Sequence, residues 1–234
     1  MAAIRFDIMT LFPDLCGTIL GESIIGRAQK AGIVEVCCHN IRDYSKDKFR
    51  RVDDTPYGGG KGMLMKPDPI CDCFDAITEG AATKPYTVYM SPKGRLFTQQ
   101  KAQELSQKDR IVILCGHYEG VDQRAIDAIV DEEISIGDYV LTGGELPACI
   151  LADAVSRLIP GVLASPECYE NESLTDGLLE YPQYTRPYEF RGEKVPDVLI
   201  SGHHENIASW RREMSLKLTK EKRPDLWKDS EEGK

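Results

Sequence analysis

The fold class follows from residues 86–136, which read YTVYMSPKGRLFTQQKAQELSQKDRIVILCGHYEGVDQRAIDAIVDEEISI. Three short runs rich in apolar residues alternate in this stretch with two segments of helical periodicity. The strands are expected at 86–90, 111–115 and 132–136, and the helices at 98–107 and 122–130. Strands that alternate with helices of this length predict a mostly parallel sheet covered on both faces. The expected fold class is therefore α/β.

The same alternation continues on both sides of this stretch. The other expected elements are strands at 4–8 and 33–38, a helix at 14–30 with breaks near Gly17 and Gly21, a helix from after Pro67-Asp-Pro69 to about Thr78, and a helix from Glu145 to Leu158. Residues 40–62 lack such a pattern and form a long charged and glycine-rich loop, of a kind that is usually functional or mobile.

The chain is expected to contain one α/β domain and a smaller appendage. Its 234 residues correspond to about one and a half domains of typical size. We assign residues 1–160 to the α/β domain, 161–177 to a polar linker and 178–234 to a small helical C-terminal domain. The helices expected in the last part span 202–219 and 223–229.

Composition excludes several classes of protein. Hydrophobic residues make up 41% and charged residues 29%, as in ordinary globular proteins, and no apolar run reaches the length of a membrane span. The formal charge of −9 argues against a non-specific nucleic-acid coat. The eight cysteines never form a C-x-x-C pair, so we expect reduced thiols in a cytoplasmic protein and no metal centre.

Three glycine-containing loops follow the three best strands, at 91–94, 116–120 and 135–144. Ligands of open parallel sheets bind at the carboxyl ends of strands, so these loops predict one shared pocket. Neither a Walker nor a Rossmann glycine motif is present. Because the loops carry Glu119 and Asp138 but only Lys93 as a base, the pocket suits a ligand with hydroxyls and a positive centre rather than a polyphosphate.

Two basic segments are candidates for contact with a phosphate backbone. Residues 42–51 hold five bases against two acids, and the terminal helix places Arg211 and Arg212 near Trp210. Each segment is either a solvated face or a nucleic-acid contact.

Four motifs follow one another along the chain: Val52–Met63 (VDDTPYGGGKGM), Gly116–Asp122 (GHYEGVD), Ser135–Pro147 (SIGDYVLTGGELP) and Gly177–Pro187 (GLLEYPQYTRP). In this order they resemble the bacterial tRNA (guanine-N1)-methyltransferases, the TrmD family of the SPOUT superfamily. The resemblance implies a deep trefoil knot within about 88–147, S-adenosylmethionine as methyl donor, and methylation of N1 of the guanosine at tRNA position 37, adjacent 3′ to the anticodon.

The resemblance also implies which residues bind. The cofactor-binding residues would be Tyr89, Ser91, Pro92, Gly116, Tyr118, Glu119, Gly120, Ser135, Ile136, Gly137, Asp138, Tyr139, Val140, Leu141, Gly143, Gly144 and Pro147. The tRNA-binding residues would be Asp53, Gly58, Gly59, Gly62, Arg211 and Arg212. The implied partners are the anticodon stem-loop of tRNA and a second copy of the chain in a homodimer with its active sites at the interface, with no membrane and no DNA.

The implied catalytic pair is Glu172 and Arg157. Members of the family usually have an aspartate as general base where this chain reads Asn-Glu-Ser, which places Glu172 at that position and leaves Asp176 as the alternative. Guanine N1 carries a proton at neutral pH, so a base must remove it before or during in-line methyl transfer. An arginine can stabilise the negative charge that then develops on O6. Magnesium assists catalysis in the family, although the sequence contains no visible protein site for it.

Two other functions remain open. A related knotted methyltransferase could modify another RNA position or a ribose hydroxyl, and an RNA-binding module could have kept the fold without the activity.

Overall fold

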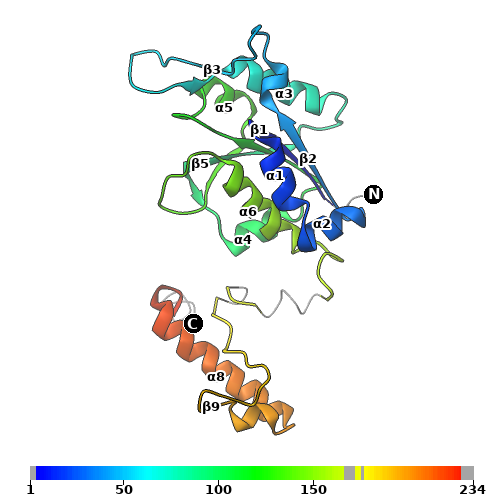
Figure 1. Ribbon diagram of the computed structural model, residues 1–234, viewed down its shortest axis with the longest axis vertical. Coiled ribbons are helices and arrows are strands. Elements are labelled where there is room, and N and C mark those ends of the chain that lie inside the picture. The colour runs from blue at the N-terminus through cyan, green and yellow to red at the C-terminus, as the bar shows by residue number, and fades with distance from the viewer. Residues whose placement is uncertain (1–3, 166–171, 175–176, 228–234) are drawn as a thin grey trace. The chain divides into compact units, whose positions relative to one another are not determined.

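The computed structural model describes residues 4–165, 172–174 and 177–227. The chain divides into two compact units, Met1–Ser165 and Pro166–Lys234 (Figure 1). Each unit is described by itself below.

The first unit is built on one five-stranded sheet. Its strands are β1 (Ile4–Thr10), β2 (Val34–Asn40), β5 (Tyr86–Leu96), β6 (Arg110–Cys115) and β7 (Glu132–Ser135). They lie in the order β2-β1-β6-β5-β7, and every neighbouring pair is parallel. The predicted α/β class with a mostly parallel sheet is therefore confirmed.

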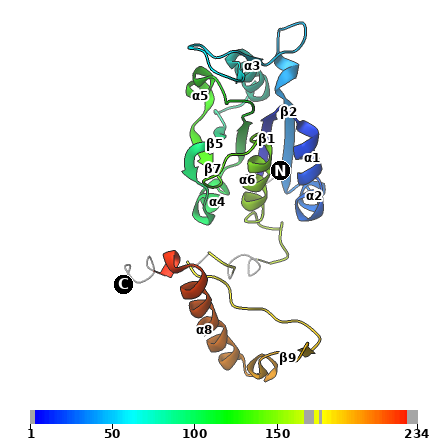
Figure 2. The same ribbon diagram turned by 60° about the vertical axis from the view of Figure 1, so that its left-hand side comes forward.

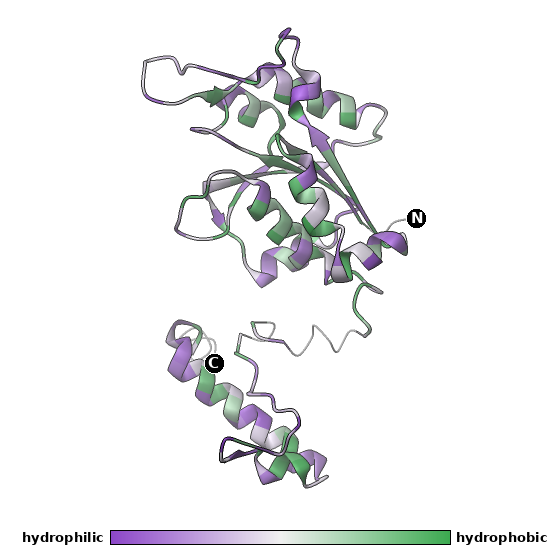
Figure 3. Cartoon of the chain, viewed as in Figure 1, coloured by the Kyte–Doolittle hydropathy of each residue, from purple (hydrophilic) through white to green (hydrophobic). Residues whose placement is uncertain are grey.

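Helices cover both faces of this sheet (Figures 1 and 2). The helices are α1 (Pro13–Leu20), α2 (Ser23–Lys30), α3 (Pro67–Thr78), α4 (Gln99–Leu105), α5 (Gln123–Ile129) and α6 (Glu145–Ser156). One core cluster joins α1, α2, α4 and α6 to the sheet, and a second joins α3 and α5 to the opposite face. Successive residues of a strand enter opposite clusters: Ile113 of β6 belongs to the first cluster and Leu114 to the second. The strands are accordingly mostly hydrophobic in Figure 3.

Two expected elements differ from the observed ones. Strand β5 continues to Leu96, so the expected loop at 91–94 lies inside it, where the pairing with β7 shifts register between Met90 and Arg95. Gly94 permits this close approach, because a Cβ there would collide with the backbone of Glu133. The expected helix at 14–30 is two helices, with the break at residues 21–22 only.

The long loop after β2 contains little regular structure, as expected. It holds a 3-10 helix, η1 (Ile41–Tyr44), and a two-residue ribbon of β3 (Asp53–Asp54) and β4 (Leu64–Met65).

The second unit is organised around α8 (His204–Lys222). The described part also contains a short hairpin, β8 (Glu189–Phe190) with β9 (Glu193–Lys194), and a 3-10 helix, η2 (Asp197–Ile200). The buried Thr219 of α8 accepts a 2.9 Å hydrogen bond from the backbone N–H of Leu179, which attaches the incoming chain to the helix. The unit is thus mainly helical, with a hairpin that the sequence pattern did not indicate.

Candidate functional site

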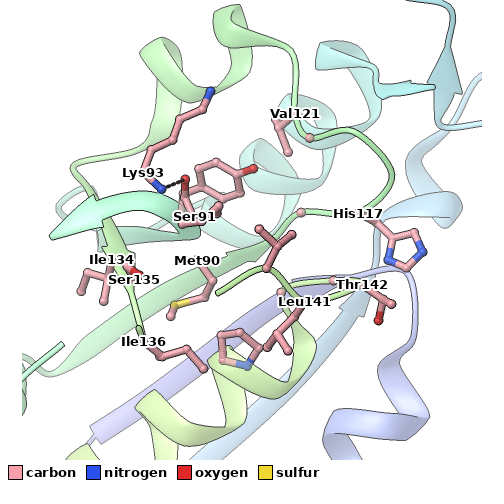
Figure 4. A pocket seen from close by; sticks show the side chains of 18 of the residues that line it. Met90, Ser91, Lys93, His117, Val121, Ile134, Ser135, Ile136, Leu141 and Thr142 are labelled. Carbon is pink, nitrogen blue, oxygen red and sulfur yellow. Dashed lines mark hydrogen bonds between the residues drawn. The ribbon is translucent and has the colours of Figure 1, made fainter. Parts of the chain in front are cut away.

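A pocket lies where residues 89–93 of β5 meet the segments that follow β6 and β7 (Figure 4). It is lined by Leu64, Tyr89, Met90, Ser91, Pro92, Lys93, Gly116, His117, Tyr118, Glu119, Gly120, Val121, Ile126, Ile134, Ser135, Ile136, Gly137, Tyr139, Val140, Leu141, Thr142, Gly143, Gly144 and Pro147. These segments come from three separate places in the sequence, and the parallel sheet brings them to one edge.

The structure brings together nearly all the residues that the resemblance implied for cofactor binding. Among them only Asp138 does not line the pocket. The lining residues that the resemblance did not imply are Leu64, Met90, Lys93, His117, Val121, Ile126, Ile134 and Thr142. Of these, Lys93, His117 and Thr142 lie in the three segments that the sequence pattern had assigned to the pocket. His117 and Thr142 also lie inside the quoted motifs, and that position could have identified them as pocket residues. The apolar ones read as ordinary core residues in the sequence.

Glycine is required at two positions of this lining. Gly137 has a φ of +148°, a conformation that side chains with a Cβ rarely adopt. A Cβ on Gly116 would lie 2.8 Å from the hydroxyl oxygen of Tyr89. The loops can therefore present backbone groups to a ligand without intervening side chains.

Backbone hydrogen bonds connect the end of the long loop to the pocket. The N–H of Glu119 donates to the carbonyl of Met63 at 3.0 Å, and the N–H of Met65 donates to the carbonyl of Gly120 at 2.9 Å. A Cβ on Gly62 would also collide with the Glu119 carboxylate. A movement of the glycine-rich loop would therefore reach the pocket wall.

The Tyr89 phenol in the pocket stays protonated at neutral pH. Burial raises the pKa of Tyr89 to about 12, with the Glu133 carboxylate adding to the shift, so the phenol keeps its proton and can donate. Tyr118, with a φ of +60°, accepts a 3.2 Å hydrogen bond from Nη2 of Arg42 through its hydroxyl. Arg42 thereby joins the basic segment to the rim of the pocket.

The two expected catalytic residues belong to different units. Arg157 is the C-cap residue of α6 and lines a second groove with Ile19, Leu146 and Ile150. Glu172 is half-buried in a bend of the second unit, while Asp176 lies outside the described residues.

The expected tRNA-binding residues are all accessible. Asp53 is half-buried in β3, and Gly58, Gly59 and Gly62 are exposed with positive φ. Arg211 and Arg212 are exposed on α8, and the guanidinium of Arg211 lies 4.7 Å from the ring centre of Tyr181.

In the described part of the chain, no group of three or more histidines, cysteines or acids is arranged to hold a metal ion, and the seven described cysteines are free thiols. Among the described helices, none combines the length and the apolar character that crossing a bilayer requires.

Comparison with known proteins identifies the family. The sequence model described as tRNA (Guanine-1)-methyltransferase TrmD matches residues 4–229. A protein of Ruminiclostridium cellulolyticum is 60% identical over 95% of this chain and 96% of its own length. Proteins of Clostridioides difficile (56% identical, 97% of this chain and 99% of the relative) and Lachnospira eligens (55%, 96% and 95%) are similar. All three are named tRNA (guanine-N(1)-)-methyltransferase. The chain, with its pocket at the carboxyl edge of a parallel sheet, therefore belongs to the tRNA (guanine-1)-methyltransferase TrmD family.

Proposed function

We propose that the protein transfers a methyl group from S-adenosylmethionine to N1 of guanosine 37 of tRNA, the nucleotide 3′ of the anticodon. The observation that carries this proposal is the convergence of the middle of β5 and the loops after β6 and β7 into one pocket, in a chain that the family matches over residues 4–229.

The chemistry of the pocket fits this methyl donor. Ile134, Ile136 and Leu141 provide an apolar lining for a planar purine, and the glycine-rich loops provide backbone donors and acceptors for its edges. When bound, S-adenosylmethionine supplies a methyl group activated by a positive sulfonium. The pocket side chains hold and orient it and exclude water.

Glu172 acts as the general base in this proposal. Guanine N1 has no free lone pair until its proton is removed, and a positioned carboxylate typically contributes 10²–10⁴-fold by accepting such a proton. Glutamate is one methylene longer than the aspartate usual in the family, so the backbone around it must lie slightly farther from the base. Asp176 is the alternative proton acceptor.

Arg157 stabilises the charge that proton removal creates. Loss of the N1 proton moves negative charge to O6 of the purine, and a guanidinium directed at that oxygen lowers the barrier in a site with little water.

The active unit is proposed to be a homodimer. Large apolar side chains of α1 and α6 and of the turn before α1 are exposed to between 43% and 49%: Phe12 44%, Leu15 44%, Ile19 43%, Leu146 49% and Ile150 47%. A contiguous apolar face of this kind favours association. Arg157 shares a groove with three of these residues, so a second copy seated there would cover its surroundings. Each site would then combine one subunit's cofactor loops with Arg157 and Glu172 of the partner subunit.

The tRNA is proposed to contact both units. The exposed glycine loop and the basic segment beside it would close over the anticodon loop, and Arg211 and Arg212 would contact phosphates of the stem. The target base must leave the stack to reach the donor. A tRNA substrate implies a cytoplasmic enzyme, and magnesium would assist catalysis bound with the RNA rather than in a site made by the described residues.

A deep trefoil knot around residues 88–147 is part of the proposal. A hydrogen bond from the N–H of Gly144 to the carbonyl of Gly116 and a bridge between His117 and Gly143 support it, since they join the loops that would cross.

Nucleoside mass spectrometry tests the proposal. Unmodified tRNA with guanosine at positions 36 and 37 is incubated with the protein and S-adenosylmethionine, beside a matched transcript with adenosine at position 37. We expect N1-methylguanosine in the first RNA and none in the second. A ribose methyl would instead indicate a different knotted methyltransferase, and absence of donor binding in calorimetry would indicate an RNA-binding module.

A further inference from the structure

Glu145 is a buried carboxylate beside the pocket. It is the first residue of α6 and only 4% of its surface is exposed. The hydroxyl of Thr10, itself fully buried, donates a 2.8 Å hydrogen bond to its Oε1. Among the described residues, no lysine or arginine forms an ion pair with it. Its place in the first turn of α6, where the helix dipole favours negative charge, and the hydrogen bond from Thr10 offset the cost of burying this carboxylate.

The carboxylate reaches the pocket wall at Gly143. A Cβ on Gly143 would collide with Oε2 of Glu145 and would lie 2.7 Å from Nδ1 of His117. Gly143 and His117 both line the pocket, and Figure 4 shows His117 and Thr142 at the same end of it. Nδ1 of His117 is buried and has no hydrogen-bond partner within the described ranges. No side-chain atom of Gly143 therefore separates the negative charge from the lining.

The other charged side chains of the pocket are exposed. Glu119 and Lys93 line it, but water surrounds both side chains and screens them. A charge buried among packed side chains is screened far less, so its field extends farther into the pocket. Glu145 is therefore the acid best placed to act on a charged ligand without touching it.

We infer that Glu145 is a specificity-determining residue that makes the pocket prefer a positively charged sulfonium ligand over a neutral thioether. This inference rests on the proposed function. The methyl donor is cationic at sulfur and the product, S-adenosylhomocysteine, is not. The preference would thus favour donor binding and product release. Glu145 acts through space, and Thr10 holds its carboxylate against Gly143.

Calorimetry on the full chain tests the inference, with S-adenosylmethionine and S-adenosylhomocysteine measured separately. Glu145→Gln keeps the acceptor for Thr10 and removes the charge. We expect it to weaken donor binding about five- to tenfold and product binding less than twofold. Glu145→Asp keeps the charge and is expected to keep the wild-type ratio of the two affinities. A purely structural role would weaken both ligands equally in Glu145→Gln, and that result would overturn the inference.

Glu119→Gln is the comparison variant, since it removes an exposed acid that lines the pocket; it is expected to weaken both ligands by a similar factor and to leave their affinity ratio unchanged. A change of the affinity ratio in Glu119→Gln but not in Glu145→Gln would overturn the assignment. Should Glu145→Gln not fold, wild-type affinities decide: sinefungin, whose amine replaces the sulfonium centre, is expected to bind several-fold more tightly than S-adenosylhomocysteine, and equal affinity would overturn the inference. Failure of the wild-type protein to bind any of the three ligands would instead refute the proposed function.

Discussion

The backbone N–H of Gly144 donates a 2.8 Å hydrogen bond to the carbonyl oxygen of Gly116. This bond joins the loop that follows β7 to the loop that follows β6, and both loops line the pocket. The approach is so close that a Cβ on Gly144 would lie 2.8 Å from the Cα of Cys115 and 3.0 Å from the backbone nitrogen of Gly116. Neither atom belongs to a flexible side chain, so the two loops can meet only if this residue is glycine.

Gly144→Ala is therefore expected to separate the two loops. We expect a loss of about 1–3 kcal/mol in the free energy of unfolding from overpacking, and a larger loss of donor affinity because the pocket wall moves. Urea denaturation and calorimetry measure the two effects. Gly17→Ala is the control: Gly17 lies inside α1 with no atom within 4 Å of the added Cβ, so it should gain about 0.5–1 kcal/mol. Unchanged donor binding in Gly144→Ala would contradict the importance of this contact.

Glu172→Gln is expected to reduce methylation of tRNA about 10²–10⁴-fold, because the amide cannot accept the N1 proton. Donor affinity should stay within about twofold of wild type, since the cofactor loops are unchanged. Single-turnover methylation and calorimetry separate these readouts. Glu189→Gln, at an exposed position of the same unit, should leave both unchanged. Full activity in Glu172→Gln together with loss in Asp176→Asn would transfer the role to Asp176.

Mixing two inactive variants tests whether the sites are shared between subunits. Gly144→Ala, assayed at a donor concentration below the dissociation constant of the variant, and Glu172→Gln should each be nearly inactive as homodimers. After subunit exchange, half of the dimers are mixed, and each mixed dimer has one site with both residues intact. About a quarter of wild-type activity should therefore return. No recovery after demonstrated exchange would place both residues in sites made by one subunit.

Ile150→Asp is expected to prevent dimer formation. Ile150 is 47% exposed in the middle of the apolar face of α6, and a buried carboxylate at a subunit interface is strongly unfavourable. Sedimentation velocity should show a dimer for the wild type and a monomer for the variant, with methylation lost in parallel. Ile200→Asp, at a residue 62% exposed in the second unit, should remain dimeric. A dimeric and active Ile150→Asp would exclude this face as the interface.

Asp7 should make the first unit sensitive to acid. Burial alone would raise the pKa of this fully buried carboxyl, but hydrogen bonds with His39, Arg5 and Arg110 lower it below its ordinary value. The distances to these three partners are 2.7–3.0 Å. A folded-state pKa below the unfolded one contributes stability that is present above about pH 4 and is lost as the pH falls through the folded value.

Urea denaturation between pH 7 and pH 2 checks this prediction. The free energy of unfolding of the wild type should decrease below about pH 4. Asp7→Asn should be less stable at pH 7 by about 1–3 kcal/mol, since it removes the charged acceptor of the half-buried guanidinium groups of Arg5 and Arg110, and its stability should depend less on pH in the acid range. Equal acid dependence in both proteins would show that other carboxyls are responsible.

The regular part of the first unit could be predicted because its signals are local. The apolar run at 111–115 reflects strand propensity, and the prolines near the start of α3 indicate a helix N-terminus, which neighbouring residues report directly. The helix begins at Pro67, about three residues before its expected start. The extension of β5 to Leu96 was missed because it depends on a bulge against β7, a strand about 40 residues farther along the chain. The hairpin of the second unit was missed for a related reason, since each of its strands is only two residues long.

The three segments that form the candidate pocket could be predicted, although the first lies within β5 and is not a loop, but the electrostatics of the pocket could not. Glu145 reads in the sequence as an ordinary acid in the first turn of a helix. Its burial depends on Thr10, which is 135 residues away, and on the absence of a side chain at Gly143. Likewise, the apolar face around Ile150 reads as part of a core helix, because periodicity reports which side chains share a face and not what covers that face.

Sequence alone was sufficient for the alternation of strands and helices, the identity of the glycine loops and the family to which the chain belongs. Each of these depends on residues that are neighbours along the chain or stand in an ordered set of motifs. Only the tertiary structure shows which acids are buried, which loops touch at Gly116 and Gly144, and which apolar side chains remain exposed. Burial and contact depend on distances between atoms of remote segments, and no local pattern encodes those distances.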